Sequence, residues 1–150
     1  EDDCLPDPDW LANAARRFED EPEIDVLDGL TEKPGGHPVR LRPGNDPLYL
    51  PTNLFVRRAA FARAGGFCES FYEPEGAVYF REDSDFGFSL EAAGARVARD
   101  RTVRVVHPEE HPRFLDPLRW AGRYLMDPLL ARRHPERYES ITAVSRREVG

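Results

Sequence analysis

The chain has 150 residues, 40% of them hydrophobic and 33% charged, which is typical of one folded globular domain rather than a disordered segment. Its formal net charge of −7 argues against nucleic acid as a partner, because such binding depends on cationic side chains that neutralise phosphates. No apolar run reaches the roughly 18 residues of a membrane-spanning helix, and no secretory leader opens the chain, which predicts a soluble, cytoplasmic protein.

The first third of the chain predicts a helix, a short strand and a long loop. Asp7 is the expected helix N-cap and Pro8 the first helical residue, where its missing N–H group costs nothing. Apolar residues at helical spacing continue this helix to about residue 19. Apolar and acidic residues then alternate over 23–26, which predicts a strand, whereas residues 33–51 are rich in proline and glycine and predict a loop.

The rest of the chain alternates between strand and helix signals. A buried strand is expected at 53–56, a helix at 59–64 that ends at two glycines, and a second helix at 82–93 that starts on acidic residues. Valines predict strands at 97 and at 103–106. The alternation favours an α/β fold in which helices flank a mixed sheet.

The two cysteines do not form a recognisable redox or metal motif. Cys4 and Cys68 lie far apart and in no C-x-x-C arrangement, so we expect small buried side chains rather than a disulfide or a zinc site. The residues from His107 to His111 spell H-x-x-E-H, but prolines bracket the segment and disfavour the helix that a zinc protease needs.

The chain opens on three acids, Glu1-Asp2-Asp3, and its only methionine is Met126. We therefore expect Glu1 to be an internal position of a longer protein. In an extended segment Glu1 and Asp3 face the same way, which suits a divalent metal with phosphate oxygens as further ligands. The alternative is a solvated acidic segment without a ligand.

Three carboxylates occur together in Arg81-Glu82-Asp83-Ser84-Asp85, at the expected start of a helix. They either complement the positive end of the helix dipole or include a general base for a substrate hydroxyl. His107 ends a predicted strand, where it is either a surface residue or a metal ligand.

Aromatic, leucine and arginine residues are interleaved in an interrupted helix that is expected over residues 113–133. Such a helix either covers a core or lies on an anionic membrane surface. The second alternative would place the protein at the cytoplasmic face of a membrane, with Arg119 and Arg123 in contact with lipid.

The order of these motifs resembles the family 2 glycosyltransferases of GT-A fold, over about residues 1–107. The resemblance is carried by Glu1-Asp2-Asp3-Cys4-Leu5-Pro6-Asp7-Pro8-Asp9-Trp10-Leu11, Pro51-Thr52-Asn53-Leu54-Phe55-Val56-Arg57-Arg58, Gly65-Gly66-Phe67, Arg81-Glu82-Asp83-Ser84-Asp85-Phe86 and Val106-His107. It implies a nucleotide-diphosphate-sugar donor, a divalent metal and inversion at the anomeric carbon by direct displacement.

The resemblance also assigns roles to individual residues. Asp3, at the end of the D-x-D position, and His107 would bind Mn2+ or Mg2+. Asp83 would be the base that deprotonates the acceptor hydroxyl, with Glu82 positioning the acceptor. Substrate contacts are implied for four further residues: Glu1, Asp2, Asn53 and Arg81. Glu1 departs from the usual aspartate of the motif.

By the same resemblance, residues 1–107 would be the C-terminal half of a GT-A catalytic domain and residues 108–150 a helical, variable tail. The half that binds the nucleotide base would precede Glu1, so we expect these 150 residues alone to turn over little or no donor. The acceptor would be a sugar or a lipid-linked molecule.

Two other hypotheses remain at this stage. One is a non-catalytic binding module that keeps the fold, which the missing half and Glu1 favour. The other is a glycoside hydrolase that uses Glu82 with a second carboxylate as acid and base, although the sequence marks no second carboxylate at a suitable separation.

Overall fold

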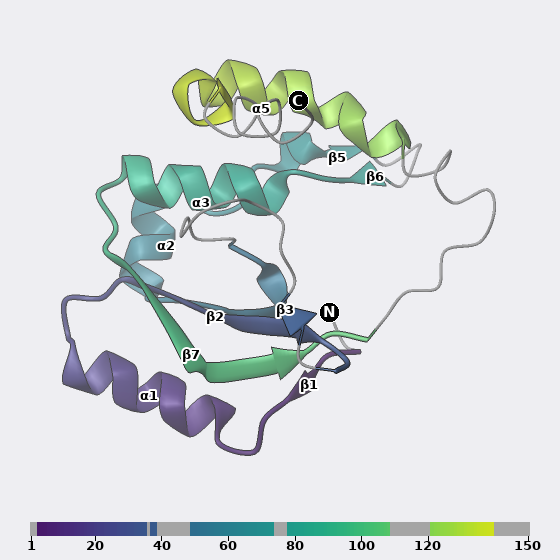
Figure 1. Ribbon diagram of the computed structural model, residues 1–150. Coiled ribbons are helices and arrows are strands. Elements are labelled where there is room, and N and C mark those ends of the chain that lie inside the picture. Colours follow the sequence, from purple (N-terminus) through teal and green to yellow (C-terminus); the bar gives the residue numbers. More distant parts are fainter. Residues whose placement is uncertain (1–2, 36, 39–48, 74–77, 109–120, 140–150) are drawn as a thin grey trace.

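The computed structural model describes residues 3–35, 37–38, 49–73, 78–108 and 121–139. In these residues a mixed sheet has helices against both of its faces (Figure 1). The expected α/β class, with a mixed sheet flanked by helices, is therefore confirmed.

The sheet is built around two parallel strands, β2 (Val26–Lys33) and β7 (Val97–Val106). Strand β1 (Leu5–Pro6) pairs antiparallel with β7, whereas β3 (His37–Pro38) and β4 (Leu54–Val56) pair antiparallel with β2. The prediction of separate strands at 97 and 103–106 was wrong, because one strand runs through both. The pairing between β2 and β7 is interrupted once. The register shifts between Gly29 and Leu30 of β2, which lie opposite Asp100 and Arg104 of β7.

Successive side chains of β2 point to opposite faces of the sheet, and each face carries its own core. Val26 faces helices α2 (Arg58–Ala64) and α3 (Glu82–Ala92), whereas Leu27 faces helix α1 (Trp10–Asp20). The buried residues of the first core are Val26, Tyr49, Ala60, Phe86 and Leu90, and those of the second are Ala14, Leu27 and Val103.

A further helical layer covers the side of α3 that faces away from the sheet (Figure 1). It contains the 3-10 helix η3 (Gly122–Met126) and helix α5 (Asp127–Arg133), which has a proline in its first turn. Leu130 of α5 shares a buried cluster with Phe71 and Phe88. The region after residue 107 therefore packs against side chains from the region before it.

The remaining described elements are short and connect these layers. They are two 3-10 helices, η1 (Pro51–Asn53) and η2 (Glu69–Phe71), and a small two-stranded sheet of β5 (Tyr72–Glu73) and β6 (Val78–Tyr79). None of the described helices combines the length and the apolar character needed to cross a bilayer.

Helix α1 starts later than its sequence signals predicted. Its N-cap is Asp9 rather than Asp7, and no side-chain cap hydrogen bond is formed. Asp7 instead continues the pairing of β1 with β7: its N–H donates to the Arg104 carbonyl at 3.0 Å, and its carboxylate lies 3.1 Å from the Arg104 guanidinium. A tertiary contact therefore outweighs the local capping preference.

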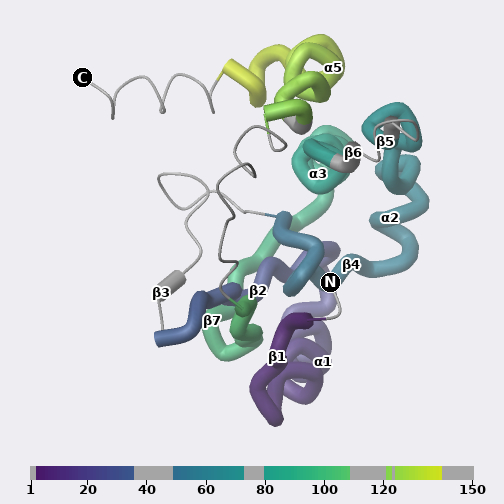
Figure 2. The backbone as a smooth tube through the Cα atoms, turned by 90° about the vertical axis from the view of Figure 1, so that its right-hand side faces the viewer, coloured from purple at the N-terminus to yellow at the C-terminus, as the bar shows by residue number. Residues whose placement is uncertain are grey.

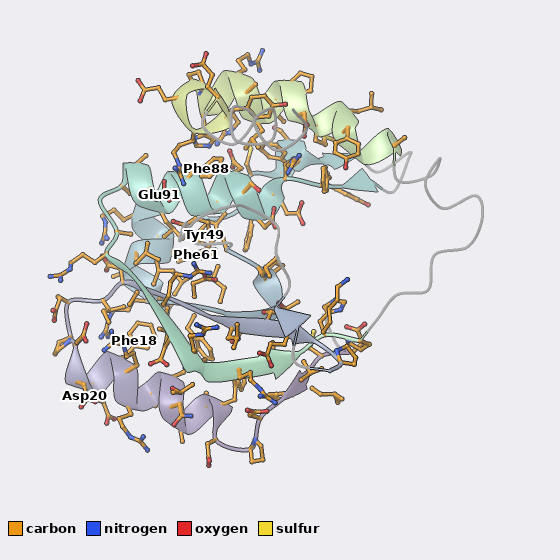
Figure 3. The ribbon with its side chains drawn as sticks, in the orientation of Figure 1. Phe18, Asp20, Tyr49, Phe61, Phe88 and Glu91 are labelled. Atoms are coloured by element: carbon orange, nitrogen blue, oxygen red, sulfur yellow. The ribbon has the colours of Figure 1, made fainter. Side chains whose placement is uncertain are left out.

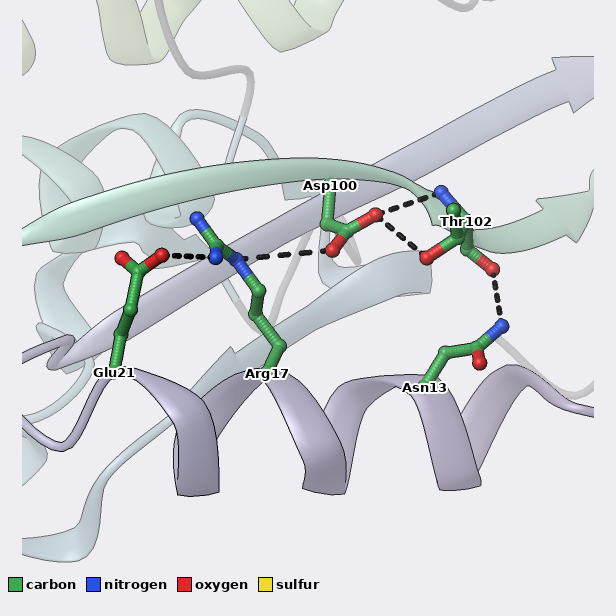
Figure 4. A network of polar contacts seen from close by, with 5 residues as sticks. All are labelled: Asn13, Arg17, Glu21, Asp100 and Thr102. Atoms are coloured by element: carbon green, nitrogen blue, oxygen red, sulfur yellow. Dashed lines mark hydrogen bonds and ion pairs between the residues drawn. The ribbon is translucent and has the colours of Figure 1, made fainter.

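Polar contacts fasten α1 to the irregular middle of β7 (Figure 4). The Asn13 amide donates to the Thr102 carbonyl at 2.9 Å, and Arg17 lies 3.7 Å from Asp100. The Asp100 carboxylate also accepts from the Thr102 N–H and hydroxyl, at 2.8 and 2.6 Å. These bonds satisfy backbone groups that the interrupted strand pairing leaves without ladder partners.

Candidate functional site

Most of the described candidate residues lie toward one side of the molecule. Strands β2 and β7 both end there, and helix α3 begins on the same side (Figure 1). Figure 2 views the molecule from this side, with α3 nearly end-on above the strands. The carboxyl ends of parallel strands are the usual place for ligand sites in open α/β sheets, so this end is the candidate site.

Asp3 and His107 come together because β1 pairs with the end of β7. The register sets Leu5 opposite Val106, which brings the residues just before Leu5 beside His107. Potential ligand atoms of Asp3, Cys4 and His107 all lie within 4.8 Å of one another. This proximity is what the predicted metal role of Asp3 and His107 requires, and the role itself stays a prediction.

Cys4 was missed as a member of this group. The sequence predicted a small buried side chain, but Cys4 is half-buried, and like Cys68 it forms no disulfide. Its Sγ lies 3.8 Å from Oδ1 of Asp3. Only the pairing of β1 with β7 could reveal that the thiol lies near His107, which is far from Cys4 in the sequence.

The His107 ring is held in an orientation that suits a metal ligand. Its Nδ1 lies 2.8 Å from the Pro108 carbonyl oxygen, and because a carbonyl only accepts, Nδ1 carries the proton. In the neutral ring the lone pair is then on Nε2. Metal-binding histidines commonly donate their other N–H group to a carbonyl in this way. With the Asp3 carboxylate nearby, the donor atoms fit a divalent cation.

The predicted base, Asp83, lies in the first turn of α3 and is half-buried. Its Oδ1 accepts a hydrogen bond from the Ser84 N–H at 2.6 Å, which orients the carboxylate at the positive end of the helix. Glu82, the first residue of α3, is also half-buried, and its Oε2 atom is buried.

Arg81, a predicted substrate contact, is engaged within the protein. Its guanidinium lies against Asp127 of α5, with Nε 2.6 Å from Oδ1, and stacks on the Phe80 ring. Its φ of 75° is a left-handed conformation that is rare for residues other than glycine. The Asp127 pair and the ring contact hold this backbone, and with it the turn that leads into Glu82.

Asp85 is the most deeply buried of the acidic residues through which α3 contacts the outer layer. Its side chain is 1% exposed and lies 2.6 Å from Nε of Arg133 and 2.8 Å from Nε2 of His134. The hydrogen bond to Asp85 raises the pKa of Arg133 above its ordinary value. In the sequence, Asp85 was one of three carboxylates at a helix start, and its neighbours in the chain did not indicate that Arg133 and His134 would be its partners.

Asn53, another predicted substrate contact, is buried at the gap between β2 and β7. Its amide nitrogen donates to the Leu30 carbonyl at 3.0 Å and to the Val103 carbonyl at 2.9 Å. Its amide oxygen accepts from the Trp10 indole at 2.8 Å. Asn53 thus replaces ladder bonds that the irregularity removes, and Gly29 leaves the space for it.

Gly29→Ala is expected to lower the free energy of unfolding by about 2–3 kcal/mol, since overpacking adds to strained hydrogen bonds. A Cβ at Gly29 would lie 2.3–2.5 Å from three amide atoms of Asn53. Urea denaturation followed by circular dichroism measures the change. Gly122→Ala is the matched control, because nothing lies within 4 Å of its added Cβ. Equal stabilities of the two variants would contradict the packing role of Gly29.

Some of the residues singled out from the sequence lie in parts of the chain that the structure does not describe. Glu1 and Asp2 lie outside the described residues, as do residues 113–120 of the predicted tail helix. Within the part of the tail that is described, Tyr124 and Leu125 of η3 are 59% and 77% exposed.

In comparisons with known proteins, neither a protein-family model nor a curated protein matches this chain.

Proposed function

We propose that the chain carries the metal and acceptor side of an inverting glycosyltransferase of the GT-A type, with a nucleotide-diphosphate-sugar as donor. The observation that carries the proposal is the approach of Asp3 to His107, whose ligand atoms lie within 4.8 Å of each other although they belong to separate strand ends. The start of α3, with Glu82 and Asp83, lies on the same side of the molecule and supports it (Figure 1).

Each residue has a defined task in this proposal. Asp3 and His107 would hold the divalent cation, Mn2+ or Mg2+, which when bound stabilises the negative charge on a departing nucleoside diphosphate. Asp83 removes the proton from the acceptor hydroxyl as that oxygen attacks the anomeric carbon. Glu82 positions the acceptor, and the contact between Arg81 and Asp127 keeps the turn before both carboxylates in place.

Asp83→Asn is expected to lower the rate of sugar transfer by about 10²–10⁴-fold, the usual contribution of a general base, while donor binding survives. Transfer is measured with the protein as it occurs naturally, against UDP- and GDP-sugars and a mixture of acceptors. Binding of the nucleotide is measured separately by calorimetry, so that a lost base is distinguished from a lost donor site.

Asp20→Asn is the matched control, because Asp20 is an exposed acid at the end of the sheet away from the candidate site (Figure 3). Its transfer rate is expected to equal that of the unmodified protein. Undiminished transfer by Asp83→Asn would refute the assignment of the base. Absence of transfer by the folded, unmodified protein with every donor would refute the proposed function.

A further inference from the structure

The group at the junction of β1 and β7 contains a thiol as well as a carboxylate and an imidazole. Asp3, Cys4 and His107 offer one oxygen, one sulfur and one nitrogen, all within 4.8 Å of one another. Carboxylate, water and phosphate oxygens suffice for Mg2+, whereas sulfur is a ligand that soft and borderline metals select. The presence of Cys4 therefore bears on which ion this site takes.

We propose that Cys4 is the third protein ligand and that the site takes a thiophilic divalent transition metal, with Zn2+ as the type, in preference to Mg2+. The inference shares Asp3 and His107 with the proposed function and revises the choice of cation made there, since Cys4 favours a thiophilic ion over Mg2+. Three protein ligands are also the number found in zinc sites that keep a fourth position for water or substrate.

The sulfur and the carboxylate oxygen are close enough to share one metal ion after a small movement. With metal bonds of about 2.3 Å to sulfur and 2.0 Å to oxygen, a tetrahedral angle separates these ligands by about 3.5 Å and an octahedral angle by about 3.0 Å. The separation of Cys4 Sγ from Asp3 Oδ1, over which the thiol can donate to the carboxylate, is 3.8 Å, so either geometry would draw the two atoms closer. Tetrahedral coordination is typical of zinc, whereas Mg2+ requires an octahedron.

The His107 ligand is fixed in place by the backbone around it. The main-chain N–H of His107 donates to the Glu32 carbonyl of β2 at 2.7 Å, and its ring Nδ1 donates to the Pro108 carbonyl. The first bond fixes the backbone of His107, and the second leaves the lone pair of the neutral ring on Nε2, the nitrogen that would bind the metal. Such support from second partners raises metal affinity, commonly by 10–100-fold in other sites.

The test uses Co2+ as a visible probe, added to the tag-free protein, and compares Cys4→Ser with Cys68→Ser. We expect a thiolate-to-cobalt charge-transfer band in the unmodified protein and in Cys68→Ser, and no such band in Cys4→Ser. One equivalent of Zn2+ should abolish the band, whereas a large excess of Mg2+ should leave it. Zinc affinity should fall at least about tenfold in Cys4→Ser.

Persistence of the band or of the full zinc affinity in Cys4→Ser would overturn the inference, and so would displacement of Co2+ by Mg2+. Circular dichroism of both variants establishes that they fold. The outcomes also separate this inference from the proposed function. Metal-dependent transfer that is unchanged in Cys4→Ser would refute the role of Cys4 as a ligand but not the proposed function. A cobalt–thiolate band in a protein without transfer activity would refute the proposed function but not the role of Cys4.

Discussion

Asp85→Ala is expected to lower the free energy of unfolding by about 3 kcal/mol, because it removes the buried partner of the Arg133 guanidinium and the His134 ring. The Asp85 side chain is 1% exposed, and its replacement by alanine would leave Arg133 and His134 without the carboxylate of α3 that they contact. The value is at the low end for a broken buried pair, since Arg133 is 40% exposed and water can replace part of the lost contact.

Urea denaturation followed by circular dichroism measures this loss, and two further variants test its cause. Glu23→Ala removes an exposed pair with Arg96, whose side chains are 45% and 66% exposed, and should change stability by less than about 0.5 kcal/mol. Arg133→Ala combined with Asp85→Ala should cost less than the sum of the two single variants. Additive losses would contradict a direct interaction between them.

Gly87→Ala is expected to destabilise the protein by about 3 kcal/mol, although alanine is the better helix former by about 1 kcal/mol. The reason is the ring of Tyr49, which is fully buried and packs against α3 where Gly87 has no side chain (Figure 3). A Cβ at Gly87 would lie 2.2 Å from Cδ2 of Tyr49. Such a contact requires the ring or the helix to move.

The Tyr49 ring is held from its other end, so it cannot yield easily. Its hydroxyl donates to Glu91 at 2.6 Å, and Arg137 lies 2.9 Å from the same carboxylate. Burial, together with the hydrogen bond to Glu91, raises the pKa of Tyr49 well above its ordinary value, which keeps the phenol a donor.

The measurement for Gly87→Ala is again the urea midpoint and slope, with Gly122→Ala as the control. In a Tyr49→Leu background, where no ring fills the space, Gly87→Ala should cost much less. A stabilising effect of Gly87→Ala in the natural background would show that helix propensity, rather than the clash with Tyr49, decides the outcome.

Local signals in the sequence predicted several elements well, because their causes lie within a few residues. Helix α2 ends at Gly65, whose φ of 87° is the left-handed conformation expected from the paired glycines. Helix α3 begins at Glu82 as its acidic start predicted, and α5 begins at Asp127. The α/β class followed from the order of these elements.

Distant partners decided what local signals could not. Asp7 is a good capping residue, but Arg104 of β7 takes its carboxylate, so α1 begins after it. Asn53 lies in a segment that the sequence predicted as strand, and it fills a gap between β2 and β7 that only their mutual register creates.

For the candidate site, the sequence by itself determined the residue types: carboxylates at Asp3 and Asp83 and an imidazole at His107. Tertiary structure alone decided that Asp3 and His107 lie together, that Cys4 joins them, and that Asp85 faces α5. The physical reason is that strand pairing and helix packing bring together residues far apart in the chain, and their register depends on the whole core rather than on the neighbours of any one residue.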